Sequence, residues 1–354
     1  MIWNTNAILI KTQAAPDHPY FFGAYNFMLS WLNGQTEFTL HTSGSTGTPK
    51  AILITRAQLS SSAFMTGTAL DLPAGTKALV CLNIDYIAGV MMLVRGMELG
   101  WELSIIAPVS NPLIDMDWDV SFDFVSMVPM QLAACLSDEK TKSHVNNLGK
   151  ILLGGAPVGV SLQKQIDELN VPVYQSYGMT ETVSHVALKK LNFPVKEDDY
   201  VVLPGVAFGV DERGCLFLNG TVTYSEKIQT NDLVDITSDT TFNWLGRVDN
   251  VINSGGVKIV LDKVDEVVAE VFYELRYDSD FFSWYETDEK LGQKLILIVR
   301  ETDHPVSVTV ILDEIRKRIS AYETPKHVYF AAEFIKTPTD KIDKRKTASL
   351  VLEN

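Results

Sequence analysis

The strongest constraint on the fold is the stretch from residue 77 to residue 175, where short apolar runs alternate with segments of helical spacing. Helical spacing covers residues 87–99, 130–136 and 161–169, and Ser161 stands where an N-cap is expected. The strand-like runs are residues 77–82, 103–107, 124–128, 150–153 and 171–175. Strands that alternate with helices of about ten residues are typical of parallel sheets built from βαβ units. The chain is therefore predicted to have an α/β core.

The pattern changes on both sides of this core. Helices are predicted at residues 25–32 and 58–70 before it. After residue 200, short strands separated by Gly, Asp and Asn favour an antiparallel meander or a small barrel-like part; they cover residues 200–210, 215–219, 221–223 and 242–245. Beyond residue 249, a helix face around residues 264–271, a strand at 294–300 and an amphipathic helix at 308–319 indicate a small α+β unit.

Length and spacing suggest two domains. A chain of 354 residues is long for one domain, and the polar segment Arg247-Val248-Asp249-Asn250 separates the two patterns. We predict a large N-terminal core at residues 1–248, made of mixed and parallel sheets with helices, and a small mobile α+β domain at residues 249–354.

Charge and composition exclude several functions. A net charge of −14 argues against nucleic acid as a partner, because phosphate backbones are bound by basic faces. The three cysteines form no C-x-x-C pair and the six histidines no H-x-x-x-H pair, so no zinc site is expected. The first residues lack the basic segment and the long apolar core of a signal peptide, so none is expected, and the sequence has no run of 18 apolar residues. We expect a cytoplasmic protein without membrane insertion; a homodimer is left open.

The segment His41 to Lys50, HTSGSTGTPK, has the composition of a phosphate-binding loop. Gly44 and Gly47 allow successive backbone N–H groups to converge on an oxyanion, and Lys50 adds a positive charge. Strand-like residues on both sides predict a hairpin around the loop. The P-loop of NTPases is excluded, because that motif requires Ser or Thr after its lysine and opens a helix.

The loop resembles the phosphate loop of the adenylate-forming enzymes, which include acyl-CoA synthetases, adenylation domains and luciferases. Further stretches match this family in its usual order: residues 153–157 (LGGAP), 177–182 (YGMTET), 230–232 (TND), 246–259 (GRVDNVINSGGVKI) and 337–345 (TPTDKIDKR). The resemblance covers most of the chain. Only 40 residues precede His41, whereas the family usually has well over a hundred, so we expect its N-terminal subdomain to be shortened.

The resemblance implies the residues that bind ATP. Tyr177 would stack on adenine, Thr180 would contact the α-phosphate, Asp232 would accept from the ribose hydroxyls, and Glu181 would bind Mg²⁺. The full implied set for ATP is Thr42, Ser43, Gly44, Ser45, Thr46, Gly47, Lys50, Gly154, Gly155, Ala156, Tyr177, Gly178, Met179, Thr180, Asp232 and Arg247.

Family membership also implies two half-reactions and a domain rotation between them. Lys341 would be the catalytic lysine of acyl-adenylate formation, Asp249 the hinge, and Gly255 and Gly256 the lining of the tunnel for the CoA thiol. The family usually has Gly where Asn231 and Asp340 stand. Both Asn and Asp tolerate a left-handed backbone, so we expect the two turns to be kept.

Residues 82–89 (LNIDYIAG), continuing to Arg95, suggest the acid substrate. They are similar to the L-P-x-x-H-I-[SA]-G…R segment of o-succinylbenzoate–CoA ligases of menaquinone biosynthesis, with Tyr86 where His usually stands. Tyr86, Gly89 and Arg95 are therefore implied to contact the acid, and Arg95 could bind a second carboxylate in a bidentate manner. A helix-surface arginine or a structural ion pair is equally compatible with Arg95.

The resemblance thus predicts an ATP-dependent acid–CoA ligase that uses ATP, Mg²⁺ and CoA, with o-succinylbenzoate as the expected acid. Two alternatives stay open. One is an adenylating enzyme that passes another aryl or acyl group to a carrier-protein thiol. The other is an inactive relative that binds nucleotide or a partner.

Overall fold

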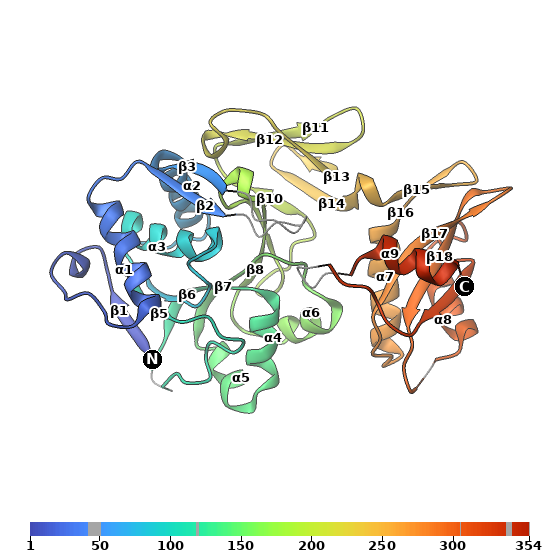
Figure 1. Ribbon diagram of the computed structural model, residues 1–354, viewed down its shortest axis with the longest axis horizontal. Helices are drawn as coiled ribbons and strands as arrows, with labels where there is room; N and C mark the ends of the chain where they lie inside the picture. Colours follow the sequence, from blue (N-terminus) through green and yellow to red (C-terminus); the bar gives the residue numbers. More distant parts are fainter. Residues whose placement is uncertain (42–50, 118–119, 305, 338–341, 354) are drawn as a thin grey trace.

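Two large sheets organise the protein in the computed structural model, which describes residues 1–41, 51–117, 120–304, 306–337 and 342–353 (Figure 1). The first sheet has 12 strands in the order β1-β5-β4-β6-β7-β8-β9-β10-β14-β13-β12-β11, and the second has five. A separate pair, β2 and β3, forms a two-stranded sheet. Within the described residues, no helix is long and apolar enough to span a membrane.

The predicted parallel core is confirmed. β5, β4, β6, β7 and β8 are neighbours in that order and all pair in parallel. Their bounds are Lys77–Val80 (β4), Glu102–Ile106 (β5), Phe122–Met127 (β6), Leu148–Leu153 (β7) and Val173–Gly178 (β8). The helices that connect them are Ile87–Leu99 (α3), Pro129–Ser137 (α4), Glu139–Val145 (α5) and Val160–Asp167 (α6). Ser161 does not cap α6 as predicted, because the helix begins one residue earlier, after Gly159.

Helices cover both faces of this parallel core, as its apolar strands require. One core cluster contains Phe124 of β6 with buried side chains of α3 and of the N-terminal helices. The other contains the next residue, Val125, with buried side chains of α4 and α6. Figure 1 shows α1, α2 and α3 on one side and α4, α5 and α6 on the other. Alternation along each strand therefore feeds two separate cores.

The N-terminal segment adds an edge strand and two helices. Strand β1 (Ile2–Thr5) pairs antiparallel with β5, and helix α1 (Pro19–Leu32) follows the 3-10 turn η1 (Leu9–Lys11). This helix begins six residues before the predicted start, because the His18 ring accepts from the Tyr20 N–H and Pro19 fits the first helical position. Helix α2 (Arg56–Ala69) begins at a capping box of Thr55 and Gln58.

The hairpin strands predicted on both sides of the phosphate loop are confirmed. β2 (Glu37–His41) and β3 (Ala51–Thr55) pair antiparallel from Glu37↔Thr55 to His41↔Ala51. The loop itself, residues 42–50, lies outside the described residues.

The antiparallel part continues the first sheet as a meander. Its strands are His185–Lys190 (β9), Tyr200–Val202 (β10), Val206–Val210 (β11), Cys215–Gly220 (β12), Ile228–Ser238 (β13) and Thr241–Arg247 (β14). Gly205, with φ +86°, divides the predicted strand 200–210 into β10 and β11. Residues 221–223 were predicted as a strand and are instead the 3-10 turn η3 (Thr221–Thr223), in which the Thr223 hydroxyl donates to the Gly220 carbonyl.

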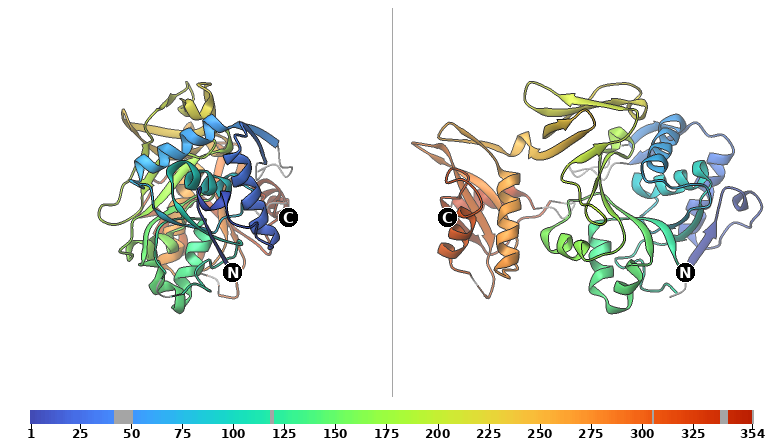
Figure 2. Two further views of the ribbon diagram at one scale, coloured as in Figure 1. Left: turned by 90° about the vertical axis from the view of Figure 1, so that its left-hand side faces the viewer. Right: turned by 180° about the vertical axis from the view of Figure 1, so that it is seen from behind.

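The second sheet forms the C-terminal α+β unit. Its strands are Val251–Ser254 (β15), Val257–Val260 (β16), Phe281–Asp288 (β17), Gly292–Arg300 (β18) and His327–Ala331 (β19). Helices α7 (Leu261–Glu274) and α8 (Val308–Arg316) bury one face, and α9 (Lys344–Leu352) buries the other. One 3-10 turn, η4 (Val248–Asn250), connects the two sheets, and the views in Figure 2 show the two units side by side.

We expect Gly89→Ala to destabilise the protein. A Cβ at Gly89 would lie 2.3 Å from the Asn83 carbonyl oxygen, so the start of α3 would have to move away from the backbone it packs on. Overpacking of this kind costs about 1–3 kcal/mol. The matched control is Gly23→Ala in α1, where the nearest atom would be 3.6 Å away and about 1 kcal/mol of helix propensity would be gained. Urea unfolding of both variants measures the difference, and equal stabilities would contradict the packing argument.

Candidate functional site

Three glycines lie at the carboxyl ends of β7 and β8, where parallel sheets commonly bind ligands. A Cβ at Gly154 would lie 2.7 Å from the Ser176 hydroxyl, and one at Gly178 would lie 2.3 Å from the Ser184 carbonyl oxygen. Gly155 has φ +82°, a conformation that favours glycine. Ala156 follows and is exposed. Two neighbouring strand ends therefore present backbone rather than side chains at this edge.

Four predicted site residues form one connected polar network. The Tyr177 hydroxyl donates to Asp232 Oδ2 at 2.6 Å. Asp232 on β13 is paired in register with Arg247 on β14, and Arg247 Nη1 lies 3.7 Å from Asp232 Oδ1. Arg247 Nη2 donates to Asp249 Oδ2 at 3.1 Å. The structure thus brings together residues from three separate motifs.

Burial differs along this network. Asp232 is only 13% exposed at its side chain, whereas Arg247 and Asp249 are 49% and 58% exposed. Burial, and then the charge of Asp232, raise the pKa of Tyr177, so its phenol keeps its proton and donates to the carboxylate. The Tyr177 ring also packs edge-on against Phe242, with 5.4 Å between ring centroids. The inner end of the network is fixed, and its outer end is open to solvent.

Residues 180–182 form a 3-10 turn, η2 (Thr180–Thr182), after Met179. Glu181 in this turn is exposed. The turn ends at Val183, which has φ 67° and ψ −57° and is 1% exposed, while the Ser184 N–H donates to the Thr182 carbonyl at 2.7 Å. These features define a classic γ-turn, a strained conformation that the buried Val183 side chain holds in place.

The prediction of a turn at Asn231 is wrong. Asn231 lies inside β13 and has no positive φ. Its amide donates to Asp249 Oδ2 at 3.4 Å, and its carbonyl oxygen accepts from Arg213 Nη1 at 3.3 Å. Sequence reasoning treated Asn231 as a substitute for Gly and missed both contacts, because nothing in its spacing marks a side-chain role. Arg213 was missed for the same reason.

The predicted CoA-tunnel glycines lie apart from this network. Gly255 (φ +61°) and Gly256 (φ +86°) form the two-residue turn between β15 and β16, where Ser254 pairs with Val257. Two consecutive positive φ values are those of a type I′ hairpin turn. The remaining predictions lie outside the described residues: Thr42, Ser43, Gly44, Ser45, Thr46, Gly47, Lys50, Asp340 and Lys341.

Arg95 lies in the core of the larger unit. It is 2% exposed, and its guanidinium donates to the hydroxyls of Thr66 (3.2 Å) and Ser184 (3.1 Å). The His185 ring lies 3.0 Å from the same Thr66 hydroxyl. Burial lowers the pKa of Arg95 to about 9, so the group remains charged at neutral pH. Arg95 is therefore not a surface arginine, and no carboxylate among the described residues pairs with it.

The three residues predicted to contact the acid are not brought together. Tyr86 precedes α3 and is 46% exposed, whereas Arg95 is nine residues further on, about 13 Å along the helix axis. Gly89 packs against the backbone of Asn83 and Ile84 and has a structural role of its own.

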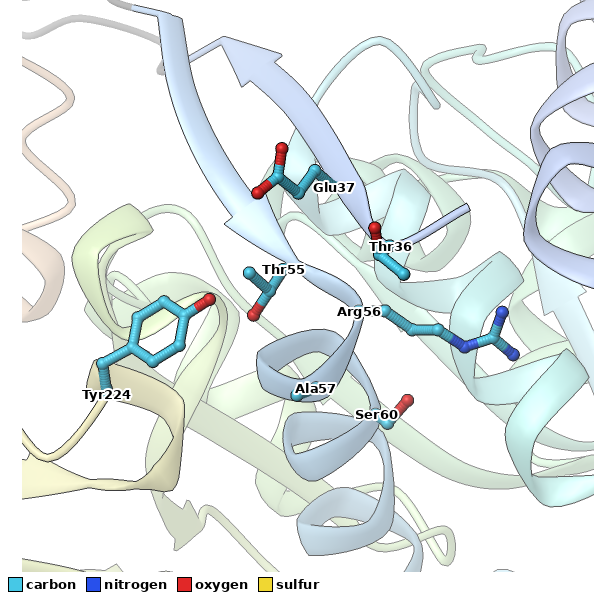
Figure 3. A pocket seen from close by; sticks show the side chains of 7 residues that line it. All are labelled: Thr36, Glu37, Thr55, Arg56, Ala57, Ser60 and Tyr224. Atoms are coloured by element: carbon cyan, nitrogen blue, oxygen red, sulfur yellow. The ribbon is translucent and has the colours of Figure 1, made fainter. Parts of the chain in front are cut away.

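An open pocket of about 450 Å³ lies elsewhere, beside the β2–β3 hairpin (Figure 3). Its lining residues are Thr36, Glu37, Thr55, Arg56, Ala57, Ser60 and Tyr224. Figure 3 shows the Arg56 side chain extending away from Tyr224. Its guanidinium lies 3.3 Å from Glu98 and 4.3 Å from the centre of the Trp31 ring, so its charge is already compensated. The pocket contains none of the predicted site residues.

A metal site made of protein ligands alone is absent from the described part of the chain, since no group of three His, Cys, Asp or Glu side chains gathers there. Mg²⁺ does not need one, because it is commonly held by one or two carboxylates together with substrate phosphates. Glu181 offers one exposed carboxylate beside the glycine-rich strand ends, which suits this mode of Mg²⁺ binding.

The chain matches the AMP-binding enzyme family over residues 33–210, just over half of its length. It belongs to that family. The resemblance inferred from the motifs is thereby confirmed, and so is the prediction that the protein is an enzyme.

Individual relatives extend the comparison. A solved acyl-CoA synthetase (AMP-forming)/AMP-acid ligase II-like protein from Dyadobacter fermentans is 58% identical, with 99% of this chain and 100% of that chain covered and a TM-score of 0.71. The 2-succinylbenzoate–CoA ligase of Lactococcus lactis is 27% identical, over 86% of this chain and 68% of the relative. The structure of O-succinylbenzoate coenzyme A synthetase from Bacillus subtilis, solved with ATP and magnesium ion, is 21% identical in sequence and has a TM-score of 0.71. The match covers 88% of this chain and 69% of that chain, and it supports the fold.

Stability should fall on the acid side of neutrality because of His185. Burial, and then the charge of Arg95, hold the pKa of His185 well below its usual value, so the unfolded state binds more protons than the folded state below about pH 6.5. The resulting loss approaches about 1.4 kcal/mol per pH unit. His185→Gln can still donate to Thr66 but does not titrate. The difference in the free energy of unfolding between wild type and this variant should therefore change between pH 7.5 and pH 5.5 in urea titrations. For a control at the exposed His304, His304→Gln, the same difference should not change with pH. A pH-independent gap for His185→Gln would contradict the assignment.

Proposed function

We propose that the protein is an AMP-forming acid–CoA ligase, with 2-succinylbenzoate as its acid. The observation that carries the proposal is the network of Tyr177, Asp232, Arg247 and Asp249, which lies beside the turn between the two sheets. Membership of the AMP-binding enzyme family supports a nucleotide as the ligand of this network.

The chemistry of the network suits a nucleotide. Asp232 is acceptor-only when ionised and can accept from both ribose hydroxyls while Tyr177 donates to one of its oxygens. The exposed guanidinium of Arg247 can reach ribose or phosphate oxygens. A flat base can approach the backbone at Gly155, which is exposed and has no side chain of its own.

In the first half-reaction, a carboxylate oxygen of the acid attacks the α-phosphorus of ATP. An acyl–O–P bond forms, the bond to the β-phosphate breaks, and pyrophosphate leaves. Lys341 would neutralise the negative charge that develops between carboxylate and phosphate. Mg²⁺ held by Glu181 would offset the charge of the phosphates. In the second half-reaction the CoA sulfur attacks the acyl carbon, AMP leaves, and the thiol proton passes to solvent.

Both half-reactions would use one site by rotation of residues 249–354 against residues 1–248, with Asp249 as the hinge. A single 3-10 turn between the sheets supports this division. So does the comparison with the Dyadobacter protein, because a TM-score of 0.71 is low for chains that are 58% identical and suggests a different placement of similar units. After rotation, the turn at Gly255 and Gly256 would line the path of the thiol.

The choice of acid rests on the names of the relatives and on Arg95. A buried charge is costly unless it is paired, and the described partners of Arg95 are neutral. 2-Succinylbenzoate carries a second carboxylate, which would supply a negative charge if the acid reached Arg95, a side chain that is 2% exposed in this structure. Curated relatives named 2-succinylbenzoate–CoA ligase match 86–90% of this chain at about 25% identity, which supports the same acid.

Exchange of labelled pyrophosphate into ATP tests the proposal. We expect exchange that depends on 2-succinylbenzoate, and formation of 2-succinylbenzoyl-CoA after CoA is added. Exchange with fatty or amino acids but not with this acid would overturn the substrate. Exchange without thioester on addition of CoA would favour a carrier-protein thiol as the acceptor.

Lys341→Ala should separate the half-reactions. Loss of the charge at the reacting carboxylate should lower the rate of adenylate formation about 10²–10³-fold. Thioester formation from preformed acyl-adenylate should stay within a few fold of wild type. The exposed Lys346 supplies a control, Lys346→Ala, that should leave both rates unchanged. Unchanged adenylate formation in Lys341→Ala would contradict the catalytic role.

A further inference from the structure

Asp262, near the start of α7, contacts the turn that joins the two sheets. Its Oδ2 accepts from the Arg247 backbone N–H at 2.8 Å. Both of its oxygens also accept from the Asn250 amide, at 2.9 and 3.1 Å. No motif marked Asp262, because an acidic residue in the first turn of a helix is common on electrostatic grounds alone.

The contacts of Asp262 with Arg247 and with Asn250 differ in their position relative to Asp249. Arg247 precedes Asp249, and Asp262 follows it, so the bond between them crosses the hinge. Asn250 and Asp262 both follow Asp249, so their bonds stay on one side. A rotation about Asp249 that carries the C-terminal unit away must break the first contact and can leave the second intact.

Close packing of the backbone supports the crossing contact. Gly246, which precedes the last residue of β14, Arg247, has φ +142°. A Cβ there would lie 2.6 Å from Val260 Cγ1 and 2.7 Å from Asp262 Oδ2. The end of β14 and the start of α7 therefore touch directly, and a glycine is needed for that approach.

We propose that Asp262 is a positioning residue that holds Arg247 and the C-terminal unit in the orientation suited to adenylate formation. The proposal rests on the proposed function. The described segment between β19 and α9 extends toward the larger unit in both Figure 1 and Figure 2. That side of the C-terminal unit is the one that would act in the first half-reaction.

A contact that exists in only one orientation shifts the balance between orientations when it is removed. Loss of a hydrogen bond to a charged group corresponds to a change of about tenfold in an equilibrium. Asp262→Ala should therefore lower the rate of adenylate formation relative to thioester formation by about tenfold. Asp262→Asn, which keeps one acceptor oxygen, should fall between Asp262→Ala and wild type.

Asn250→Ala is the matched control. It removes the amide that donates to Asp262 but leaves the hydrogen bond between Arg247 and Asp262 in place. The ratio of the two rates should therefore stay within about twofold of wild type. Both rates are measured separately, as pyrophosphate exchange and as thioester formation from preformed acyl-adenylate with CoA. If Asp262→Ala lowers both rates equally, or if Asn250→Ala changes the ratio as much, the positioning role is contradicted.

A second measurement needs no substrate and distinguishes this proposal from the proposed function. Spin labels at Glu139→Cys and Lys290→Cys, two exposed positions in different units, report the distance between the units. The native cysteines Cys81, Cys135 and Cys215 are buried. Asp262→Ala should broaden the distance distribution or add a second population, whereas Asn250→Ala should match wild type. Identical distance distributions for wild type, Asp262→Ala and Asn250→Ala would contradict the positioning role of Asp262, even if no acid supported pyrophosphate exchange.

Discussion

The hydrogen bond from Tyr177 to Asp232 joins the two halves of the larger sheet at the candidate site. Tyr177 lies near the end of the parallel strand β8, and Asp232 lies on an antiparallel strand 55 residues later in the chain. Because β13 pairs with β14 in a fixed register, Asp232 also sets the position of Arg247, which lies next to the only described connection between the two sheets. A half-buried phenol that keeps its proton thus anchors a series of charged side chains that extends outward to Asp249, the proposed hinge.

Much of the fold followed from periodicity. The alternation between residues 77 and 175 predicts the parallel sheet of the core. The structure adds the strand order and the burial of both faces, since Phe124 and Val125 belong to opposite core clusters. Strand β13 was missed because its buried positions include Thr230 and Asp232, so hydrophobic alternation does not reveal it. Residues 221–223 are β-branched and read as a strand, but their hydroxyl contacts favour a turn instead. Local side-chain hydrogen bonds therefore outweigh the strand propensity of residues 221–223.

The site was predicted where contacts follow from motif order and was missed where they depend on exact geometry. The family resemblance implied that Tyr177, Asp232 and Arg247 bind one nucleotide, and it implied Asp249 as the hinge. It could not reveal that Asn231 lies in a strand and donates to Asp249, or that Asp262 accepts from the backbone N–H of Arg247. Tyr86 and Arg95 share a motif, but Tyr86 is the N-cap of α3 and is exposed, whereas Arg95 is buried more than two turns further along the helix. Closeness in sequence therefore did not produce a common surface.

The central claim is that Asp232 anchors the nucleotide, and calorimetric titration with AMP tests it most directly. Asp232→Asn keeps the shape of the side chain but loses its charge, so AMP should bind at least about tenfold more weakly than to wild type. The exposed Asp235 on the same strand supplies a control, Asp235→Asn, that should bind like wild type. Equal affinity of wild type and Asp232→Asn would contradict the account.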